Sequence, residues 1–232
     1  MRIRINFLSR TRMIRIAIVA VVIANPVVSN LANAAEHGIV LPDPVVDAPL
    51  VTKSGKQVAV FAGGCFWGVQ LVFQHVKGVK NATSGYSGGT VKSAEYEQVS
   101  TGETGHAESV KVTFDPAQIS YGQLLKVFFS VVHDPTQLNR QGPDVGAQYR
   151  SVIFYGDDEQ KHIGEAYIAQ LEQARLFPRP IVTQLVPLQA FYDAEMYHQN
   201  YATFHRDDPY VEVNDLPKLE DLRELLPNVY KK

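Results

Sequence analysis

In Val58-Ala-Val-Phe-Ala-Gly-Gly-Cys65-Phe-Trp-Gly-Val-Gln-Leu-Val-Phe-Gln-His-Val76, a short apolar run is followed by an apolar pattern with helical spacing. The positions of that pattern are Phe66, Val69, Val72, Phe73 and Val76. This order predicts a strand, a glycine turn and a helix. Cys65 then falls in the first helical turn, where free backbone N–H groups and the positive end of the helix dipole favour a thiolate over a thiol. The stretch therefore makes Cys65 a candidate nucleophile.

Cys65 is also the only cysteine in the chain. It can form no internal disulfide, and it cannot be one member of a cysteine cluster that binds zinc. The structural alternative is a buried cysteine that packs as a small hydrophobic side chain. Against this alternative stand Gly63, Gly64 and Gly68, because glycines around one side chain let another molecule approach it.

The N-terminal residues have the pattern of a secretory signal peptide, predicted over residues 1–34 with cleavage after Ala34. An apolar run of nine residues, Ile16–Ala24, follows five arginines and no acid: Arg2, Arg4, Arg10, Arg12 and Arg15. The run is well short of the ~18 residues that a membrane helix needs, so we expect no membrane association after cleavage. The predicted location is secreted or periplasmic, an oxidising compartment in which a lone cysteine suggests a retained reactive thiol.

The charge balance argues against a nucleic-acid partner. Without the five N-terminal arginines, 17 Lys and Arg would face 24 Asp and Glu, a net charge of about −7. Residues 35–56 contain Pro42, Pro44 and Pro49 without a sustained apolar period, which predicts a flexible tether. We expect the rest, residues 57–232, to form one domain.

A second candidate site residue lies on a predicted strand. From His106 to Phe114 the residues alternate, so that Glu108 shares one face with Val110 and Val112. A carboxyl on an apolar face is desolvated, which raises its pKa and keeps its proton available nearer neutral pH. The alternative is a glutamate at the end of the strand that reaches water or pairs with a lysine.

Outward from these two segments, the chain alternates between strand and helix patterns. Strands are predicted over 58–63, 82–89, 106–114, 152–155 and 181–186, and helices over 66–76, 121–132 after a Ser120 cap, 157–176, 195–204 and 216–226. Short strands with helices on one side predict an α+β fold. We expect a two-layer α/β sandwich with a ferredoxin-like βαββαβ core.

Five motifs occur in one fixed order: Gly63-Gly-Cys-Phe-Trp-Gly68, Gly85-Tyr-Ser-Gly-Gly89, Thr104-Gly-His-Ala-Glu108, His133-Asp-Pro-Thr136 and Asp144-Val-Gly-Ala-Gln-Tyr-Arg-Ser151. Together they resemble the A type of peptide methionine sulfoxide reductase, over roughly residues 57–205. The resemblance implies thiol-dependent reduction of methionine (S)-sulfoxide, free or in proteins, to methionine. It implies no cofactor and no metal.

The resemblance also implies a role for each residue at a matching position. Cys65 is the nucleophile and Glu108 the proton donor, while Phe66 and Trp67 hold the methyl group of the substrate. The other implied positions line the oxygen side and are Tyr96, which rests on its spacing to Glu108, Tyr149 and Asp144. For Trp67 the alternative is packing in the core of the helix.

The chemistry of a sulfoxide fits these residue types. Its sulfur is a poor electrophile until the oxygen is protonated, so the reaction needs a thiolate aimed at sulfur and acids aimed at oxygen. Cys65 and Glu108 supply that pair, and aromatic side chains suit the methyl group. Attack would release methionine and leave Cys65 as a sulfenic acid.

Many relatives carry additional cysteines in the C-terminal tail, whereas residues 200–232 of this chain contain none. We therefore expect an external thiol reductant, such as a thioredoxin-like protein, to reduce the sulfenic acid. The implied function is the repair of oxidised exported proteins.

Three other functions compete. A cysteine hydrolase would use His106 as base, so that His106→Ala would abolish activity while Glu108→Gln would be mild; a reductase reverses that order. A zinc deaminase is suggested only by His106-Ala-Glu108 and lacks the required cysteine pair. A non-catalytic module could bind oxidised methionine with Phe66 and Trp67.

The remaining histidines are scattered along the chain, and we expect no metal site from them: His75, His162, His198 and His205.

Overall fold

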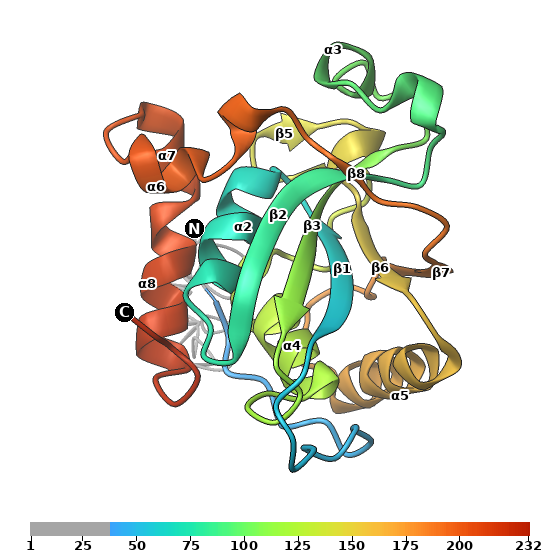
Figure 1. The fold of residues 1–232 in the computed structure, drawn as a ribbon, viewed down its shortest axis with the longest axis vertical. Helices are drawn as coiled ribbons and strands as arrows, with labels where there is room; N and C mark the ends of the chain where they lie inside the picture. The colour runs from blue at the N-terminus through green and yellow to red at the C-terminus, as the bar shows by residue number, and fades with distance from the viewer. Residues whose placement is uncertain (1–37) are drawn as a thin grey trace, which may run out of the picture.

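The computed structural model describes residues 38–232, so the predicted signal peptide lies outside the described residues. A six-stranded sheet forms the centre of the fold (Figure 1). Its strands, in spatial order, are β7 (Gln184–Pro187), β6 (Ser151–Tyr155), β1 (Gln57–Gly63), β3 (Ala107–Phe114), β2 (Val79–Ser87) and β8 (Tyr192–Asp193). All neighbouring pairs are antiparallel except β6 and β7, which are parallel.

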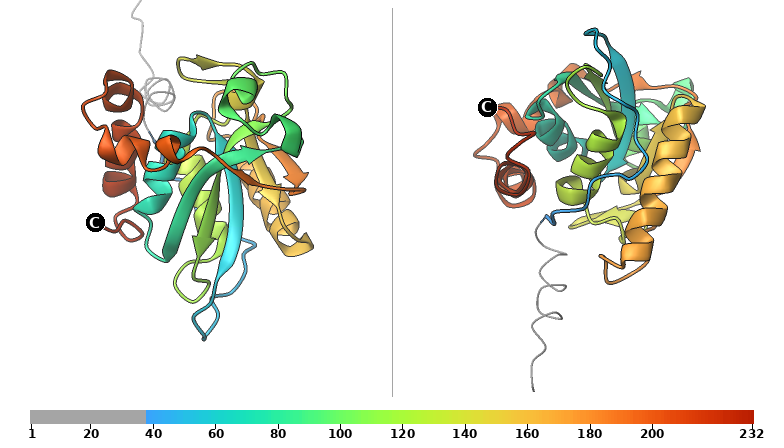
Figure 2. Two further views of the ribbon diagram at one scale, coloured as in Figure 1. Left: turned by 45° about the horizontal axis from the view of Figure 1, so that its top comes forward. Right: turned by 90° about the horizontal axis from the view of Figure 1, so that it is seen from below.

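The helices cover one face of this sheet (Figures 1 and 2). Those that lie on the sheet are α2 (Phe66–Gln74), α4 (Tyr121–Val127) with a π-helix (Phe128–Val132), and α5 (Asp158–Ala174). The helices α6 (Tyr201–Phe204) and α8 (Leu216–Leu225) pack against α2, α7 (Pro209–Asn214) packs against α8, and the short α3 (Tyr96–Val99) lies beyond the end of the sheet. Side chains of α2, α4, α5 and α8 belong to one buried cluster with Phe61, Val110 and Val112 of the sheet. This cluster is the main core, and its burial is the largest favourable contribution to folding.

The other face of the sheet is covered by coil instead of helix. A smaller buried cluster contains Val60, Ala62 and Phe154, and it packs against Leu188 and Phe191 of the segment between β7 and β8. Because both faces are covered, β1 is buried over five consecutive residues from Ala59, and it reads in the sequence as a continuous apolar run.

The structure has the mixed α/β fold, with a central sheet and helices, that the sequence predicts. The predicted cap of the second helix is confirmed, since Ser120 Oγ accepts a hydrogen bond from the Gln123 N–H (3.1 Å) and the Gln123 side chain accepts one from the Ser120 N–H. A short two-stranded sheet, β4 (Arg140–Gln141) with β5 (Asp144–Val145), lies in the loop that follows the π-helix.

The helix predicted over 195–204 is wrong. A 3-10 helix (Met196–His198) is separated from α6 by Asn200, which has a left-handed backbone with φ of 59°. The cause is the Gln199 side chain, whose amide accepts from the Ser84 N–H (3.0 Å) and donates to the Ser84 carbonyl (2.9 Å). These bonds hold the chain against strand β2, where a continuous helix would turn Gln199 away.

The described part of the segment predicted as a flexible tether, residues 38–56, packs against the domain. It contains neither helix nor strand, but Leu41 is 1% exposed within the main core. The Tyr167 hydroxyl donates to the Pro42 carbonyl (2.9 Å). Asp47 accepts from the Ser120 hydroxyl and from the Gly122 N–H (2.8 Å), which satisfies a free donor at the start of α4. We refer to residues 38–56 as the N-terminal arm.

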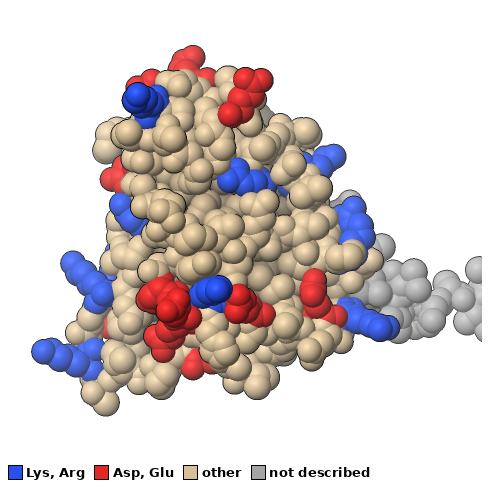
Figure 3. Space-filling model, turned by 90° about the vertical axis from the view of Figure 1, so that its right-hand side faces the viewer, with Lys and Arg blue, Asp and Glu red and all other residues tan. Residues whose placement is uncertain are grey.

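The face of the molecule on the side of α5 and β7 carries charges of both signs, and in its lower part acidic side chains gather around a basic one (Figure 3). That face offers no continuous basic patch for a phosphate backbone. Within residues 38–232, no helix is both long and apolar enough to cross a membrane.

Candidate active site

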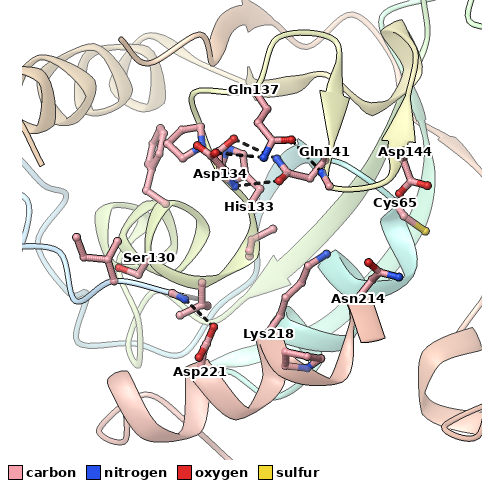
Figure 4. Close-up of a pocket in the computed structure, with 18 of the residues that line it drawn as sticks. Cys65, Ser130, His133, Asp134, Gln137, Gln141, Asp144, Asn214, Lys218 and Asp221 are labelled. Carbon is pink, nitrogen blue, oxygen red and sulfur yellow. Dashed lines mark hydrogen bonds between the residues drawn. The ribbon is translucent and has the colours of Figure 1, made fainter. Parts of the chain in front are cut away.

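Cys65 lies at the junction of β1 and α2, as the glycine turn predicts. Gly64 has φ of +93°, a conformation that glycine adopts readily, and a Cβ there would lie 2.6 Å from Cβ of Gln141. The turn places Cys65 at the N-cap of α2, with 8% of its surface exposed. It lines a cavity of about 570 Å³ between the loop after the π-helix and the C-terminal helices (Figure 4).

At Cys65, burial opposes the preference of the helix terminus for a thiolate. Burial raises the pKa of the thiol well above its usual range, and the carboxyls of Glu108 and Asp215 act in the same direction. The hydrogen bond from the Trp67 N–H and the charge of Lys218 lower the pKa by less. Cys65 therefore keeps its proton near neutral pH until something stabilises the anion.

Glu108 lies on β3 beside Cys65, and it is buried as the alternation predicts. Its exposed fraction is 2%, and one carboxyl oxygen accepts the N–H of Phe66, the residue next to Cys65, at 3.0 Å. Burial raises the pKa of Glu108 to about 8, against the opposing effect of this hydrogen bond. The carboxyl neither reaches water nor pairs with a lysine, so it can hold a proton next to the sulfur at neutral pH.

Phe66 and Trp67 begin α2 within a group of aromatic rings. Phe66 is 1% exposed, and its ring centroid lies 5.0 Å from that of His198. Trp67 is partly exposed, stacks on Tyr201 at 3.8 Å and donates its indole N–H to Nδ1 of His198 (3.2 Å). Phe66 therefore packs in the core, while Trp67 presents part of an aromatic face beside Cys65.

Tyr96 and Tyr149 come from segments far apart in the chain and meet at the same site. Tyr96 is the first residue of α3, and Tyr149 ends a 3-10 helix (Ala147–Tyr149) that follows β5. Burial raises the pKa of both hydroxyls, and the neighbouring Glu108 raises them further. Both tyrosines therefore stay protonated and can donate hydrogen bonds across the pH range in which proteins are stable.

Asp144, on β5, lines the same cavity as Cys65 (Figure 4). Its carboxylate accepts a hydrogen bond from the Tyr210 hydroxyl of α7. Burial raises the pKa of Asp144, and the bond from Tyr210 partly opposes that effect. Of the seven residues named from the sequence, Cys65 and Asp144 line the cavity. The other five do not line it: Glu108 is bonded to the Phe66 N–H, Trp67 follows Phe66 on α2, and the hydroxyls of Tyr96 and Tyr149 lie near enough to Glu108 and Cys65 for these groups to raise their pKa.

Several residues of the site were missed by the sequence analysis, and they lie in the C-terminal part of the chain. Glu195 bridges the hydroxyl of Tyr86 (2.8 Å) and the N–H of Tyr96 (2.9 Å). The others are His198, Tyr210, Asp215 and Lys218. One signal was available: Asp208-Pro209 has the pattern of a helix start, and Asp208 caps α7 through the Tyr210 N–H.

His106 is held away from the chemistry. Its Nε2 lies 3.0 Å from the Thr90 carbonyl, and its Nδ1 accepts the Gly89 N–H at 3.2 Å. Both ring nitrogens are thus occupied by backbone groups, which leaves none to act as a base toward Cys65. Nowhere in the described part of the chain do three His, Cys, Asp or Glu side chains lie together as metal ligands would.

Comparisons with known proteins identify the family of the chain. A sequence model of the peptide methionine sulfoxide reductase family matches residues 57–228. A peptide methionine sulfoxide reductase MsrA 2 of Mesorhizobium japonicum is 58% identical over 76% of this chain and 90% of its own length. Its counterpart of the same name in Synechocystis is 54% identical over 80% and 87%. The solved methionine sulfoxide reductase A of Corynebacterium diphtheriae is 33% identical over 75% of this chain and 89% of its own, with a TM-score of 0.57. The chain therefore belongs to the peptide methionine sulfoxide reductase A family and is an oxidoreductase that reduces methionine sulfoxide.

Proposed function

We propose that Cys65 reduces methionine (S)-sulfoxide by taking its oxygen, and that it is left as a sulfenic acid. The sulfur of Cys65 bonds to the sulfoxide sulfur while Glu108 protonates the sulfoxide oxygen. The resulting hydroxyl then passes to the sulfur of Cys65, the bond between the two sulfurs breaks, and the proton lost by the thiol returns to Glu108. The sulfoxide gains two electrons and leaves as methionine, and Cys65 loses two electrons and becomes S–OH. The choice of the S epimer follows from the family.

The observation that carries this proposal is the hydrogen bond from the Phe66 N–H to Glu108. It fixes a carboxyl with a pKa of about 8 beside the residue that follows the nucleophile. A protonated carboxyl at neutral pH is an unusual group, and an acid next to a sulfur is what transfer of a sulfoxide oxygen requires.

The other residues suit the two ends of the substrate. Tyr96 and Tyr149 supply hydroxyl donors for the sulfoxide oxygen, since the pKa of each is raised. Trp67, stacked on Tyr201, supplies a partly exposed aromatic ring for the methyl group, while Phe66, which precedes it in the sequence, is buried and packs against His198. Asp144 lies on the cavity wall, where its carboxylate can accept an N–H of the substrate backbone.

An external thiol returns Cys65 to its starting state in this scheme. A first thiol, R–SH, attacks the sulfenic acid, which gives a mixed disulfide and water. A second thiol then releases Cys65 and forms R–S–S–R. A dithiol protein of the thioredoxin type can supply both steps, and the absence of a second cysteine in the sequence supports an external source.

Two further parts of the proposal concern place and architecture. The N-terminal sequence supports export and the repair of oxidised proteins outside the cytoplasm, which cell fractionation with and without residues 1–34 would test. A ferredoxin-like core is supported by the antiparallel strand order β6-β1-β3-β2, in which α2 connects β1 to β2 and α4 lies between β3 and β6.

Mass spectrometry after exposure to methionine sulfoxide without reductant tests the chemistry. We expect one added oxygen on Cys65, one released methionine per chain, and neither in a Cys65→Ser variant. Methionine produced without any change in the mass of Cys65 would contradict the sulfenic acid. If the same experiment with a peptide substrate attached an acyl group to Cys65 and cleaved an amide bond of the peptide, the protein would instead be a hydrolase.

A further inference from the structure

The N-terminus of α8 places two charged side chains directly against the first turn of α2. A Cβ added at Gly68 would lie 2.1 Å from Asp215 Oδ1 and 2.9 Å from Lys218 Nζ. Gly68 is three residues after Cys65, and it is the position at which any larger side chain would displace both groups. The absence of a side chain at Gly68 is therefore what allows the two charges to approach the helix terminus that carries the nucleophile.

The two groups form a buried but loosely joined ion pair. Asp215 is 0% exposed, and the side chain of Lys218 is 19% exposed. The distance from Lys218 Nζ to Asp215 Oδ1 is 3.5 Å, and Asp215 Oδ2 has no hydrogen-bond partner among the described residues. An ammonium with one long contact keeps donors free for another acceptor. The Lys218 side chain extends from α8 into the cavity that Cys65 lines (Figure 4).

Lys218 is the only cation among the described residues that surround Cys65. The other titratable groups that face the sulfur, its cavity or the adjoining site residues are acids, tyrosines or histidines whose pKa is lowered by burial: Glu108 on β3, Asp144 on β5, Asp215 before α8, Asp134, Asp221, Tyr96, Tyr149, Tyr210, His133 and His198. Burial lowers the pKa of His133 to about 4, so this ring is neutral at pH 7. An anion on Cys65 would thus have a single positive partner.

We propose that Lys218 is the electrostatic partner of the Cys65 anion, and that Asp215 positions Lys218 over the first turn of α2 through the gap left by Gly68. This role rests on the proposed function, and it is needed twice in that cycle. Cys65 must lose its proton to attack the sulfoxide, although its surroundings favour the thiol. Later, when a second thiolate attacks the mixed disulfide, the S–S bond breaks and Cys65 leaves as an anion.

The pH dependence of alkylation by iodoacetamide tests the proposal. Only the thiolate reacts, and Cys65 is the only thiol, so the rate follows the ionisation of this residue alone. We expect Lys218→Met to raise the midpoint by about one pH unit, and so to lower the rate about tenfold below it. Asp215→Asn keeps an oxygen that accepts from Lys218 but removes the negative charge, so it should lower the midpoint. Lys218→Arg should hold the wild-type midpoint.

Arg223→Met provides the matched control. It removes a cation from the same helix, but Arg223 is exposed and pairs with Glu220 and Glu224 on the surface. Its midpoint should equal that of the wild type. If the substitutions acted only by loosening the packing, the alkylation midpoints of Lys218→Met and Asp215→Asn would shift in the same direction. Shifts of equal sign would therefore overturn the proposal, and so would an unchanged midpoint in Lys218→Met.

Two further results keep the test decisive. If Lys218→Met does not fold, as judged by circular dichroism, Lys218→Gln carries the test, because it removes the positive charge and keeps a polar side chain of similar length; a midpoint that stays or falls overturns the proposal. Alkylation needs no sulfoxide, so the outcome is separate from the proposed function. If the alkylation midpoints shift as predicted but the protein forms no sulfenic acid, the proposed function is refuted and the role of Lys218 stands. If the protein reduces methionine sulfoxide normally but the midpoints do not shift, only the role of Lys218 is refuted.

Discussion

Cys65 and Glu108 share one physical condition: both are almost fully buried, and burial raises the pKa of each. In the free protein at neutral pH both groups therefore hold a proton. The acid is ready to donate, whereas the nucleophile has to be activated during the reaction. Such an arrangement protects the thiol from indiscriminate oxidation, because oxidants react with the thiolate.

Substitutions at Glu108 and at His106 should have different effects on the reductase rate. Glu108→Gln keeps an acceptor for the Phe66 N–H but removes the acidic proton, so the reductase rate at pH 7 should fall about 10²- to 10⁴-fold. His106→Asn should cost less than about tenfold per folded molecule, because His106 bonds only to backbone groups near Gly89 and Thr90. Initial rates with a saturating thiol measure both variants. A larger loss in His106→Asn would contradict the assignment.

The raised pKa of Glu108 also predicts a pH dependence of stability. The folded protein holds this proton up to about pH 8, while the unfolded chain releases it near the ordinary value of 4.5. The folded state thus binds more protons in this window, and the contribution of Glu108 to stability is lost as the pH rises from about 4.5 to about 8. Urea unfolding at several pH values should show this decline in the wild type relative to Glu108→Gln. Parallel curves for the two proteins would refute the raised pKa.

Some properties of the site residues depend on neighbouring residues in the sequence, and others depend on distant segments of the chain. The period of two from His106 to Phe114 predicted the burial of Glu108, because a strand's faces are set by local geometry. The ionisation of Cys65 was not predictable, since the helix terminus is local whereas the burial that outweighs it comes from segments distant in sequence. Tyr210 reaches Asp144 across 66 positions, a pairing that no sequence period encodes.

At the scale of elements, five of the six strands of the central sheet and its long helices were predictable, whereas the edge strand β8, the short helices α3 and α7 and the connections were not. Apolar periods fixed β1, α2 and β3, whereas residues 195–204 have the composition of a helix and still break at Asn200. The break depends on bonds between Gln199 and the backbone of β2, which is a tertiary effect that overrides local propensity. The N-terminal arm likewise looks free in sequence and packs in the structure.

A third prediction concerns this N-terminal arm. Leu41 is 1% exposed in the main core, so Leu41→Ala should lower the free energy of unfolding by about 2–5 kcal/mol. Val45 lies four residues further along and is 85% exposed, and Val45→Ala should change the stability by less than about 0.5 kcal/mol. Thermal and urea unfolding compare the two. Equal, negligible effects would mean that the arm is detached in solution.

At the scale of the whole molecule, the cavity joins the two ends of the described chain. The Gly38 N–H donates to Asp221 of α8 at 2.6 Å, and the Ile39 N–H donates to the Ser130 carbonyl of the π-helix at 2.8 Å. Gly38, Ser130 and Asp221 all line the cavity that Cys65 shares. The walls of the site thus depend on the N-terminal arm and on α8, both of which lie outside the sheet and the helices α2 and α4.

The last prediction follows from the thiol content of the whole chain. One cysteine in 232 residues can accept one oxygen, and within the chain no second thiol exists to form a disulfide with it. A rapid-mixing experiment without reductant should release close to one methionine per chain and then stop. Dithiothreitol added afterwards should restart a steady rate that rises with its concentration, because reduction of Cys65 is then a step between two molecules. Continued turnover before the addition would mean that the oxygen is not retained on Cys65, and the proposed cycle would have to be abandoned.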